Sequence, residues 1–338
     1  MAGTPTIRDV AAKARVSVGT ASRALSGGEH VAPKTLEAVR SAAAELNYVP
    51  NALIRSLQTG KSRIVGLYLW RLDLEHAASA VYALTLGLVQ SLTEINYDAL
   101  IYHHHPFERH ETISYFMDGR ADGVILAPGA LEPEELGQLA RSGVKVVALY
   151  DASVPTNVAC VDIDNRGGVT DAIRSLAELG HTRVALIAPE YTHDYRERRR
   201  AWEAAAVDLG LQADPRLGPR ITSEHGDEVP QAVAALLDLP EPPTAIVAGD
   251  DLIAETILEA LRGLGVSVPG SMSVVGFDGH PEVVDKYDLS GVVQPALQVG
   301  MVAGRMMGRL LAGDDPADCR IVLPVQFVER GTTASAPR

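Results

Sequence analysis

The spacing of apolar residues divides the chain into a short helical segment and a long alternating one. In the first sixty residues apolar side chains recur every three or four positions, as at Leu36, Val39 and Ala43. This spacing predicts short amphipathic helices, each with one buried face. From residue 62 onward the pattern becomes short apolar runs separated by helical stretches. Such alternation predicts parallel sheets with helices on both faces.

The elements of the long segment are predicted by residue range. The predicted strands are 64–69, 99–102, 123–126, 144–149, 184–187, 245–247 and 272–276. The predicted helices among them are 80–95, 167–179, 198–209 and 252–264. Because nearly 270 residues exceed what one hydrophobic core usually holds, we expect two lobes.

Helix-start signals mark three helices in the short segment. Thr6 followed by Asp9 is a variant of the capping box. Ser17 begins a second helix, since its hydroxyl can accept a hydrogen bond from the amide of Thr20. Pro33 stands at the first position of a third helix. Two short helices joined by a tight turn and followed by a third form a helix-turn-helix, whose second helix can lie in the major groove of DNA.

The second helix carries side chains that suit DNA. Arg23 can bind a guanine with two N–H groups, and Val18 can touch a thymine methyl. Ser17 or Ser22 can contact a phosphate. A plain three-helix bundle with a solvated polar face is the alternative that spacing alone leaves open.

Charge separates the same two segments. Residues 1–63 hold nine Lys and Arg against four acids, a net charge of +5. The remaining chain holds 21 basic and 39 acidic residues, a net charge of −18. A small basic head on an acidic body favours contact of the head, and not of the body, with a polyanion such as DNA.

Composition excludes several classes of protein. The chain has 338 residues, of which 46% are hydrophobic and 22% charged, as in ordinary globular proteins. We expect no secretory signal, no membrane contact and a cytoplasmic location, because neither a leader-like apolar region nor a run of ~18 apolar residues occurs. Cys160 and Cys319 lie far apart without a CxxC partner. They are expected to be buried thiols and not a disulfide or a metal site.

Three sequence motifs then resemble a known family. They are TIRDVA at 6–11, VSVGTASRALSG at 16–27 and LNYVPNAL at 46–53. Together they closely resemble the LacI/GalR (lactose-repressor) family of bacterial transcription regulators, and the resemblance covers nearly the whole chain. It implies a small all-α helix-turn-helix DNA-binding domain followed by a two-lobed α/β effector domain of the type I periplasmic-binding-protein kind.

The resemblance also implies domain boundaries. We expect the DNA-binding domain over 1–49, a hinge helix or linker over 50–61 and the effector-binding and dimerisation domain over 62–331. The chain is expected to cross between the lobes near residues 160, 290 and 320. Lobe 1 is then about 62–160 plus 291–320, and lobe 2 about 161–290 plus 321–331.

By the same resemblance a set of residues contacts DNA. Base-reading positions are Val18, Gly19 and Arg23. Positions that meet the DNA backbone or nearby bases are Thr6, Ser17, Thr20, Ser22, His30 and Asn51. Three residues depart from the family pattern: Arg15 replaces the usual turn glycine, Ala32 replaces a serine cap, and Gly19 offers no side chain at a specificity position.

The segment 50–60 is bracketed by Pro50 and Gly60 around about eight helix-compatible residues. A helix that short is marginal in water, so we expect it to fold only with a partner. In the family this hinge helix pairs with its symmetry mate in the minor groove, where Leu57 matches the wedging leucine. Ile54 stands where a small alanine is common and also faces the groove. A flexible linker is the alternative.

Enzymatic chemistry finds little support in the long segment. The turn after the first strand, 66–71, has neither a GxGxxG nor a P-loop pattern, so no nucleotide cofactor is expected. The adjacent histidines 103–105 point to alternate faces of an extended segment and cannot easily converge on one metal ion. Asp250 and Asp251 form an acidic pair without a nucleophile–histidine constellation. We therefore expect no enzyme, no cofactor and no metal.

Ligand binding is the better account, because ligands of such folds lie beyond the carboxyl ends of the strands. Asp251 matches the ligand-binding Asp of the family segment A-N-D-x-x-A, whose Asn is Asp250 here. Arg198 matches the leading Arg of R-x-x-G-F/W, and Trp70 could stack on a ligand ring. The alternatives are a solvated charge run for Arg198, a helix cap for Asp251 and core packing for Trp70. Asp278 matches a family segment that is more structural than ligand-binding.

These inferences predict a homodimeric transcription regulator, most often a repressor in this family. Two heads should read an approximately palindromic operator, because two-fold symmetry imposes itself on the half-sites. The small-molecule effector is expected to be a sugar or a related polar metabolite. The tail 332–338 lacks leucine heptads, so no coiled-coil tetramer is expected. A solute-binding protein or an enzyme with an incidental helical head is the competing hypothesis.

Overall fold

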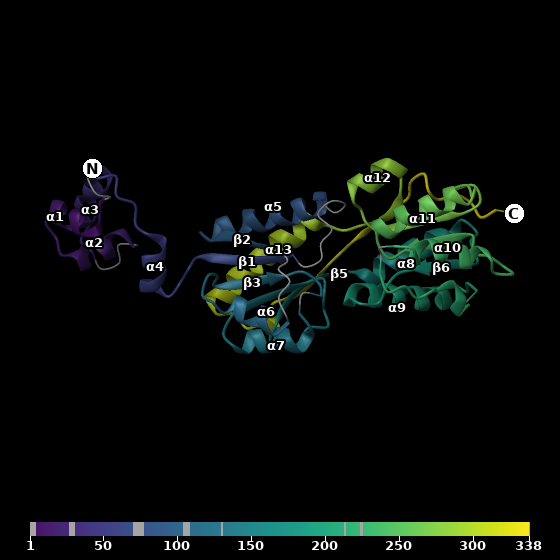
Figure 1. Cartoon of the computed structure of the whole chain (residues 1–338), viewed down its shortest axis with the longest axis horizontal. Coiled ribbons are helices and arrows are strands. Elements are labelled where there is room, and N and C mark those ends of the chain that lie inside the picture. The colour runs from purple at the N-terminus through teal and green to yellow at the C-terminus, as the bar shows by residue number, and fades with distance from the viewer. Residues whose placement is uncertain are drawn as a thin grey trace. The chain divides into compact units, whose positions relative to one another are not determined.

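The structure is a computed structural model that divides the chain into two compact units, Met1–Arg63 (the head) and Ile64–Arg338 (the body) (Figure 1). It describes residues 5–26, 31–69, 78–103, 109–129, 131–212, 214–223 and 226–337. The predicted site residues His30 and Trp70 lie outside these ranges.

The head consists of four short helices. They are α1 (Ile7–Ala14), α2 (Val18–Leu25), α3 (Pro33–Glu45) and α4 (Ala52–Thr59). The first three pack around a core of small side chains. This core consists of Val10, Ala11, Ala21, Ala24, Val39, Ala42 and Ala43. The predicted helix-turn-helix is therefore confirmed.

The ends of these helices follow the predicted caps. The backbone N–H of Thr6 donates to the Asp9 carboxylate at 2.8 Å, and the Thr6 hydroxyl donates to it at 2.7 Å. The Ser17 hydroxyl accepts from the N–H of Thr20 at 3.1 Å, as predicted. Arg15 ends α1 with φ 54° and ψ 44°, in the left-handed region. That conformation suits glycine, which explains the family's usual turn residue and makes Arg15 a locally strained choice.

The first lobe of the body is a six-stranded parallel sheet in the order β10-β5-β4-β3-β1-β2. Its strands are β1 (Ile64–Leu69), β2 (Asp98–His103), β3 (Gly123–Leu126), β4 (Lys145–Leu149), β5 (Ala159–Ile163) and β10 (Arg320–Leu323). Its helices are α5 (Ala78–Glu94), α6 (Arg109–Phe116), α7 (Pro133–Arg141), α13 (Ala296–Ala312) and the short 3-10 helix η2 (Pro316–Asp318). Residues of α5 and α13 pack with one set of buried strand residues, and residues of α6 and α7 with the alternate set, so the helices cover both faces.

The second lobe is a five-stranded sheet in the order β11-β9-β8-β7-β6, parallel except that β11 runs antiparallel to β9. Its strands are β6 (Val184–Ile187), β7 (Ala245–Ala248), β8 (Ser273–Asp278), β9 (Ser290–Val293) and β11 (Gln326–Val328). Its helices are α8 (Asn165–Glu178), α9 (His193–Asp208), the 3-10 helix η1 (Pro215–Leu217), α10 (Glu228–Leu237), α11 (Asp251–Gly263) and α12 (Pro281–Tyr287).

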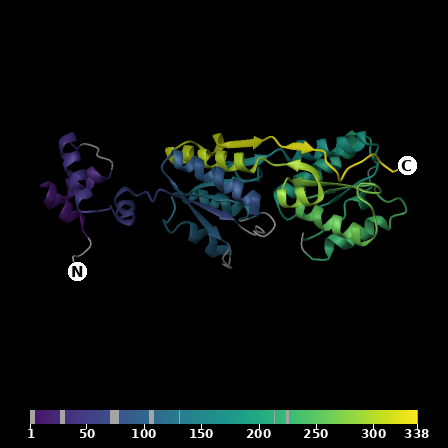
Figure 2. The same cartoon turned by 90° about the horizontal axis from the view of Figure 1, so that it is seen from above.

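The chain passes between the two sheets three times: after β5, after β9 and after β10. Figure 2 shows the last passage as the yellow end of the chain, which runs from one lobe to the other. All seven predicted strands occur, and three of them, at 64–69, 123–126 and 184–187, have the predicted ends. The predicted two-lobed α/β fold class is therefore confirmed.

The two cysteines come together in the fold without pairing. The N–H of Cys160 in β5 donates to the carbonyl of Cys319 at 2.9 Å. Cys160 packs with Tyr68 and Tyr102 on one face of the sheet, whereas Cys319 belongs to the core on the other face. Both thiols are free and buried, as expected from the sequence, and burial raises the pKa of Cys160 to about 12.

Glycines bring α5 and α13 into direct backbone contact. A Cβ atom on Gly300 would clash with the carbonyl oxygen of Leu84 in α5. A Cβ atom on Gly87 would clash with the carbonyl oxygen of Leu297 in α13. Only glycine permits this approach, so each of the two helices supplies part of the seam that joins them.

Candidate functional site

The outer side of α2 in the head is open to solvent. Val18, Gly19 and Arg23 are exposed, whereas Ala21 and Ala24 face the core. Their periodic separation follows from the helix repeat, which places positions 21 and 24 on the same side. The structure thus leaves the three predicted base-reading residues accessible, and their contacts with DNA stay a prediction.

The other predicted contacts in the helix-turn-helix surround α2. Ser17 is exposed, and its hydroxyl lies 2.8 Å from that of Thr20, which is half-buried. Ser22 is also half-buried, and its hydroxyl donates to the side chain of Gln58 in α4 at 3.2 Å. Thr6 is exposed at the start of α1. Several hydroxyls therefore surround the open face of the helix.

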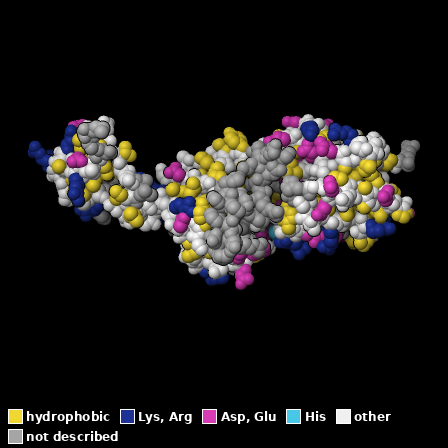
Figure 3. Space-filling model, viewed as in Figure 1, with side chains coloured by type: hydrophobic (Ala, Val, Ile, Leu, Met, Phe, Trp, Pro, Cys, Tyr) yellow, Lys and Arg dark blue, Asp and Glu magenta, His cyan; other side chains and the backbone are white. Residues whose placement is uncertain are grey.

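Basic side chains accompany this face. Arg8, Arg15, Arg23, Lys34 and Arg40 are all exposed. Figure 3 shows dark blue Lys and Arg side chains on the head, with few magenta acids on the face in view. Such a distribution suits a phosphate backbone.

Helix α4 leaves two of its apolar side chains in solvent. Leu57 is 87% exposed and Ile54 is 53% exposed. The side chain of Asn51, just before the helix, accepts from the N–H of Ile54 at 3.4 Å. A single helix with a leucine this exposed is typical of an element that meets a partner. This exposure agrees with the predicted role of the hinge helix.

In the body, Arg198 lies at the carboxyl end of the second sheet, buried in α9. Its Nε donates to the Asn165 side chain at 2.9 Å, and another of its nitrogens donates to the carbonyl of Gly249 at 2.5 Å. The guanidinium stacks over the Phe277 ring at 3.7 Å from the centroid. Interpreting Arg198 as part of a solvated charge run is therefore wrong. Glu197 and Arg200 beside it fit that description, with an ion pair of 2.5 Å near the surface.

Two carboxylates flank the Arg198 guanidinium, each 3.5 Å away: Asp194 at the start of α9 and Asp278 at the end of β8. Asp278 also accepts from Gln294 and lies 3.8 Å from His280. Burial raises the pKa of Asp278 to about 6, although Arg198 acts against this rise. These contacts with protein side chains agree with the interpretation of Asp278 as mainly structural, although the ion pair with Arg198 was not predicted. The place of Asp278 directly after a core strand was the available signal.

Asp250 and Asp251 have different roles. Asp250 begins α11: its carboxylate accepts from the N–H of Ile253 at 2.7 Å and from the Tyr195 hydroxyl. Asp251 is almost fully buried and accepts from the backbone N–H of His280 at 2.6 Å. Burial raises the pKa of Asp251 well above its usual range. The helix cap is thus Asp250 and not Asp251. A direct contact of Asp251 with an effector stays a prediction.

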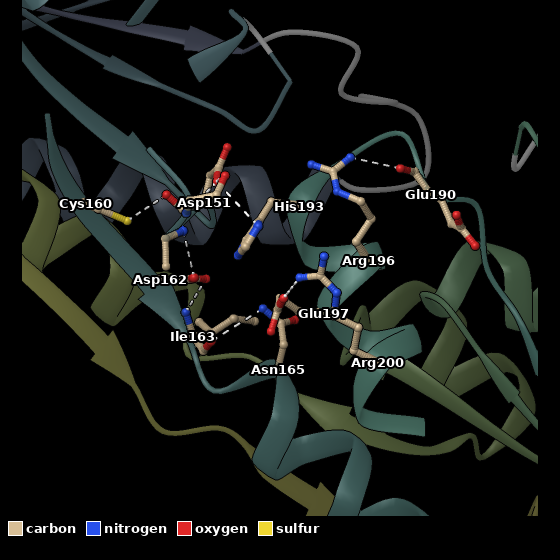
Figure 4. A network of polar contacts seen from close by, with 12 residues as sticks. Asp151, Cys160, Asp162, Ile163, Asn165, Glu190, His193, Arg196, Glu197 and Arg200 are labelled. Atoms are coloured by element: carbon tan, nitrogen blue, oxygen red, sulfur yellow. Dashed lines mark hydrogen bonds and ion pairs between the residues drawn. The ribbon is translucent and has the colours of Figure 1, made fainter. Parts of the chain in front are cut away.

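Polar contacts bridge the two lobes. Asp151, just after β4, lies 3.8 Å from the ring of His193 at the start of α9, and a dashed line marks this contact in Figure 4. On one flank of this contact, Asp162 accepts from the N–H of Ala152 at 3.0 Å. A second bridge joins α12 of the second lobe to α5 of the first.

At that second bridge, a carboxylate of the second lobe meets the start of a helix of the first. Ser79 in the first turn of α5 donates its N–H to Glu282 of α12 at 3.1 Å and its hydroxyl at 2.6 Å. A carboxylate at a helix N-terminus is a favourable arrangement. The lobes therefore meet through side chains that a change in their angle would separate.

Metal clusters and membrane-spanning helices are both absent from the described residues. No group of three or more His, Cys, Asp or Glu side chains there is arranged to hold a metal ion. His104 and His105 lie outside those residues. No helix within the described ranges is long and apolar enough to cross a membrane.

Comparison with known proteins places these two units in one family. Residues 6–51 match the model of the bacterial regulatory proteins of the lacI family, and residues 173–333 match the periplasmic binding protein-like domain. The HTH-type transcriptional regulator CelR of Thermobifida fusca is 32% identical over 96% of this chain and 97% of its own length. The chain belongs to the LacI family.

Other LacI-family proteins match over nearly their whole length. Catabolite control protein A of Priestia megaterium is 27% identical over 97% of this chain and 99% of its own. The solved CelR–cellobiose complex is 30% identical, with a TM-score of 0.71 over 97% of this chain and 99% of that chain. The Lac repressor dimer bound to operator shares the fold, with a TM-score of 0.80 over 98% of this chain and all of that chain, at 23% identity. As a family member, the chain is a DNA-binding transcriptional regulator.

Proposed function

We propose that this protein represses transcription as a homodimer bound to an approximately palindromic operator. A small polar effector in the cleft between the lobes, a sugar or a related metabolite, would control its affinity for that operator. The observation that carries the proposal is the pairing of an exposed, basic helix-turn-helix with a two-lobed body whose strand ends gather buried charged side chains.

The open faces of α2 and α4 support the part of the proposal that concerns DNA. Arg23 offers a fork of N–H groups to a base edge, and Val18 offers methyl groups. Leu57 on α4 would enter the minor groove beside its symmetry mate, where its burial replaces exposure to water. Because α4 is only eight residues long, this pairing would also supply the stability that the isolated helix lacks.

The charged cluster around Arg198 supports the part of the proposal that concerns the effector. CelR was solved with cellobiose, and the Lac repressor was solved with the anti-inducer ONPF and operator. By analogy, the polar effector of this protein would occupy the space between Asp278 and the first lobe. The change in operator affinity when the compound is added shows whether it releases the operator or strengthens its binding.

The bridges between lobes supply the route from effector to DNA. An effector changes operator affinity only as far as it binds one lobe arrangement better than the other. The Asp151–His193 and Ser79–Glu282 contacts exist only in lobe arrangements that keep these side chains close. An effector that favours such an arrangement would therefore select one relative position of the two chain segments that connect the bodies of the dimer to their hinge helices.

Fluorescence anisotropy of the full chain on labelled DNA from its own promoter region tests the proposal. We expect preference for that DNA over a shuffled fragment of the same composition. Affinity should fall steeply between 50 and 200 mM salt, by a factor of about 10³ or more if 6–10 phosphates are contacted. Equal affinity for both fragments, without salt dependence, would contradict it. Sedimentation of the free protein checks the dimer.

A thermal-shift screen against sugars, nucleosides and phosphorylated metabolites tests the effector part. A compound that binds the folded body raises its melting temperature by mass action. Addition of that compound to the anisotropy assay then shows its effect on operator binding. A compound that stabilises the body and leaves operator affinity unchanged would contradict the proposed control.

A further inference from the structure

The position of Arg198 suggests which chemistry the cleft presents. Its side chain is only 3% exposed, and each of its three nitrogens faces a protein acceptor: Asn165, the carbonyl of Gly249, or the carboxylates of Asp194 and Asp278. One face of the guanidinium is covered by Phe277. Arg198 therefore has little capacity left for a ligand and acts as a positioning residue for the two carboxylates.

The carboxylates remain more accessible than the arginine that holds them. Asp194 and Asp278 keep 14% and 18% of their side-chain surface, and Asp151 across the cleft keeps 15%. The Oδ1 atom of Asp194 is buried and has no hydrogen-bond partner among the described residues. The exposed parts of these three carboxylates can thus accept hydrogen bonds from a ligand, and Asp194 makes fewer hydrogen bonds than its two oxygens allow.

The same part of the cleft carries an excess of acids. Burial raises the pKa of Tyr150, just after β4, and the charges of Asp278, Asp194 and Asp162 raise it further, whereas the charge of Arg198 lowers it. The imidazoles of His193 and His280 contact Asp151 and Asp278 at 3.8 Å each. Among these described side chains, the four carboxylates of Asp151, Asp162, Asp194 and Asp278 outnumber the one guanidinium and the two imidazoles together.

The departure at Asp250 strengthens this asymmetry. The sequence segment it belongs to has a neutral Asn in the family pattern, and this chain has an acid. Both of its oxygens are satisfied, by the N–H of Ile253 and the hydroxyl of Tyr195. Asp250 therefore does not reach for a ligand itself. It adds a further acidic group directly behind Arg198.

We propose that the effector is a polyol that carries a protonated amine, such as an amino sugar, and that sugar phosphates and other anions are excluded. The ammonium group would lie between Asp194 and Asp278 and would supply the missing donor to Asp194, while hydroxyls of the ligand donate to the remaining carboxylate oxygens. This inference rests on the proposed effector function of the same cleft.

The test uses matched triads of probes with the purified full chain. D-glucosamine, D-glucose and D-glucose 6-phosphate form one triad, and the corresponding galactose and mannose compounds form two more. We expect at least one amine to raise the melting temperature of the body and to bind, by calorimetry, at least tenfold more tightly than its neutral counterpart. Its N-acetyl derivative, which lacks the charge, should bind no better than the neutral sugar. Rising salt should lower the affinity for the amine and leave the affinity for the neutral sugar unchanged.

Two variants locate the charge. Asp194→Asn should lower affinity for the amine at least tenfold and leave affinity for the neutral sugar within about twofold. Asp278→Asn should act in the same direction. Asp171→Asn, on the exposed side of α8 where Asp171 pairs with Arg174 at 2.5 Å, is the matched control and should change neither affinity.

Three results would overturn the inference: a neutral sugar or a phosphate that binds as tightly as its amine, an amine whose affinity survives Asp194→Asn, or no binding of any amine. These outcomes are distinct from failure of the proposed function. A neutral sugar that binds the cleft and alters operator affinity would refute the amine and uphold the regulator. An amine that binds, with no preference of the protein for promoter DNA, would do the reverse.

Discussion

The head and the body are stabilised in different ways. The core of the head consists of five alanines and two valines. The body buries large side chains such as Phe277, Leu186 and Ile173 throughout two sheets. Because stabilisation grows with the apolar area removed from water, the small core of the head contributes little per residue. The stability of the head therefore depends more on helix caps and on a partner, whereas the large core of the body can tolerate buried charges.

The same difference appears at the surfaces. The head leaves Leu57 and Ile54 in water, where a partner can cover them. The body instead buries charged side chains, among them Arg198, Asp250 and Asp251. This contrast fits the proposal that a macromolecule covers part of the head and that a small molecule binds in the body. Substitutions that affect only one unit test this division.

The largest effect should follow Arg198→Met in the body. Removing the guanidinium leaves Asp194 and Asp278 without their counter-charge, which costs about 3–5 kcal/mol when a buried pair is broken. Tryptophan fluorescence during urea unfolding measures the body alone, since both tryptophans, Trp70 and Trp202, lie outside the head. Arg174→Met on the exposed side of α8 is the control and should change stability by less than about 0.5 kcal/mol. Equal losses from both variants would refute the positioning role of Arg198.

Leu57→Ala should reverse this pattern. Burial of a leucine against DNA contributes about 1.5–3 kcal/mol, so operator affinity should fall by most of that amount for each subunit. Unfolding of the body and effector affinity should stay unchanged. Leu264→Ala, at a leucine of the body that is also exposed, is the matched control in the anisotropy assay. Unchanged operator affinity and bending in the Leu57 variant would exclude the wedge.

Arg23→Ala separates base reading from general affinity. We expect a loss of about 1–3 kcal/mol at one operator base pair and a relaxed preference there. Measurements on operators changed one base pair at a time show the position. A uniform loss on every sequence would assign Arg23 to phosphate contact instead.

Thr6→Ala tests the dependence of the head on its caps. Loss of the cap at α1 should cost about 1 kcal/mol. Hydrogen exchange of the α1 amides in the full chain should report faster opening, with no change in the tryptophan signal of the body. If the amides of α1 exchange at the same rate in both proteins, the small core alone holds the helix.

Arg15→Gly should have the smallest effect, and two readouts should move in opposite directions. Glycine adopts the left-handed conformation at this turn without strain, so the head should gain up to about 1 kcal/mol. Loss of one positive charge should at the same time weaken DNA binding slightly at low salt. A less stable head would mean that the Arg15 side chain makes a contact which outweighs its backbone strain.

Local signals explain why so much of the fold could be predicted. A cap such as Ser17 depends on residues three positions away, and a strand such as 184–187 on an uninterrupted apolar run. Helices α6 and α7 on one face of the first sheet were not predicted. The strands β9 to β11, apart from their crossings, were also missed. Each begins with a polar residue (Ser290, Arg320 or Gln326), so none of them is an uninterrupted apolar run.

The site was predicted in part, for a different reason. The sequence singled out Arg198, which is buried and not part of a solvated charge run, but its partners come from the ends of α8, β7, β8 and α9. No local pattern reports that Asp194 and Asp278 approach one guanidinium. The exchange of roles between Asp250 and Asp251 shows the same limit, since neighbouring residues point in different directions and a shift of one position decides which one caps the helix.

The glycine seam between α5 and α13 has a mechanical consequence. Helices whose backbones touch have no layer of side chains between them that could shear or repack when force is applied. The start of α5 holds Glu282 of the second lobe, and α13 begins just after the chain has returned from that lobe. The pair should therefore move as one rigid body. A small displacement at the edge of the cleft would then rotate the whole first lobe and would not be absorbed by movement between the two helices.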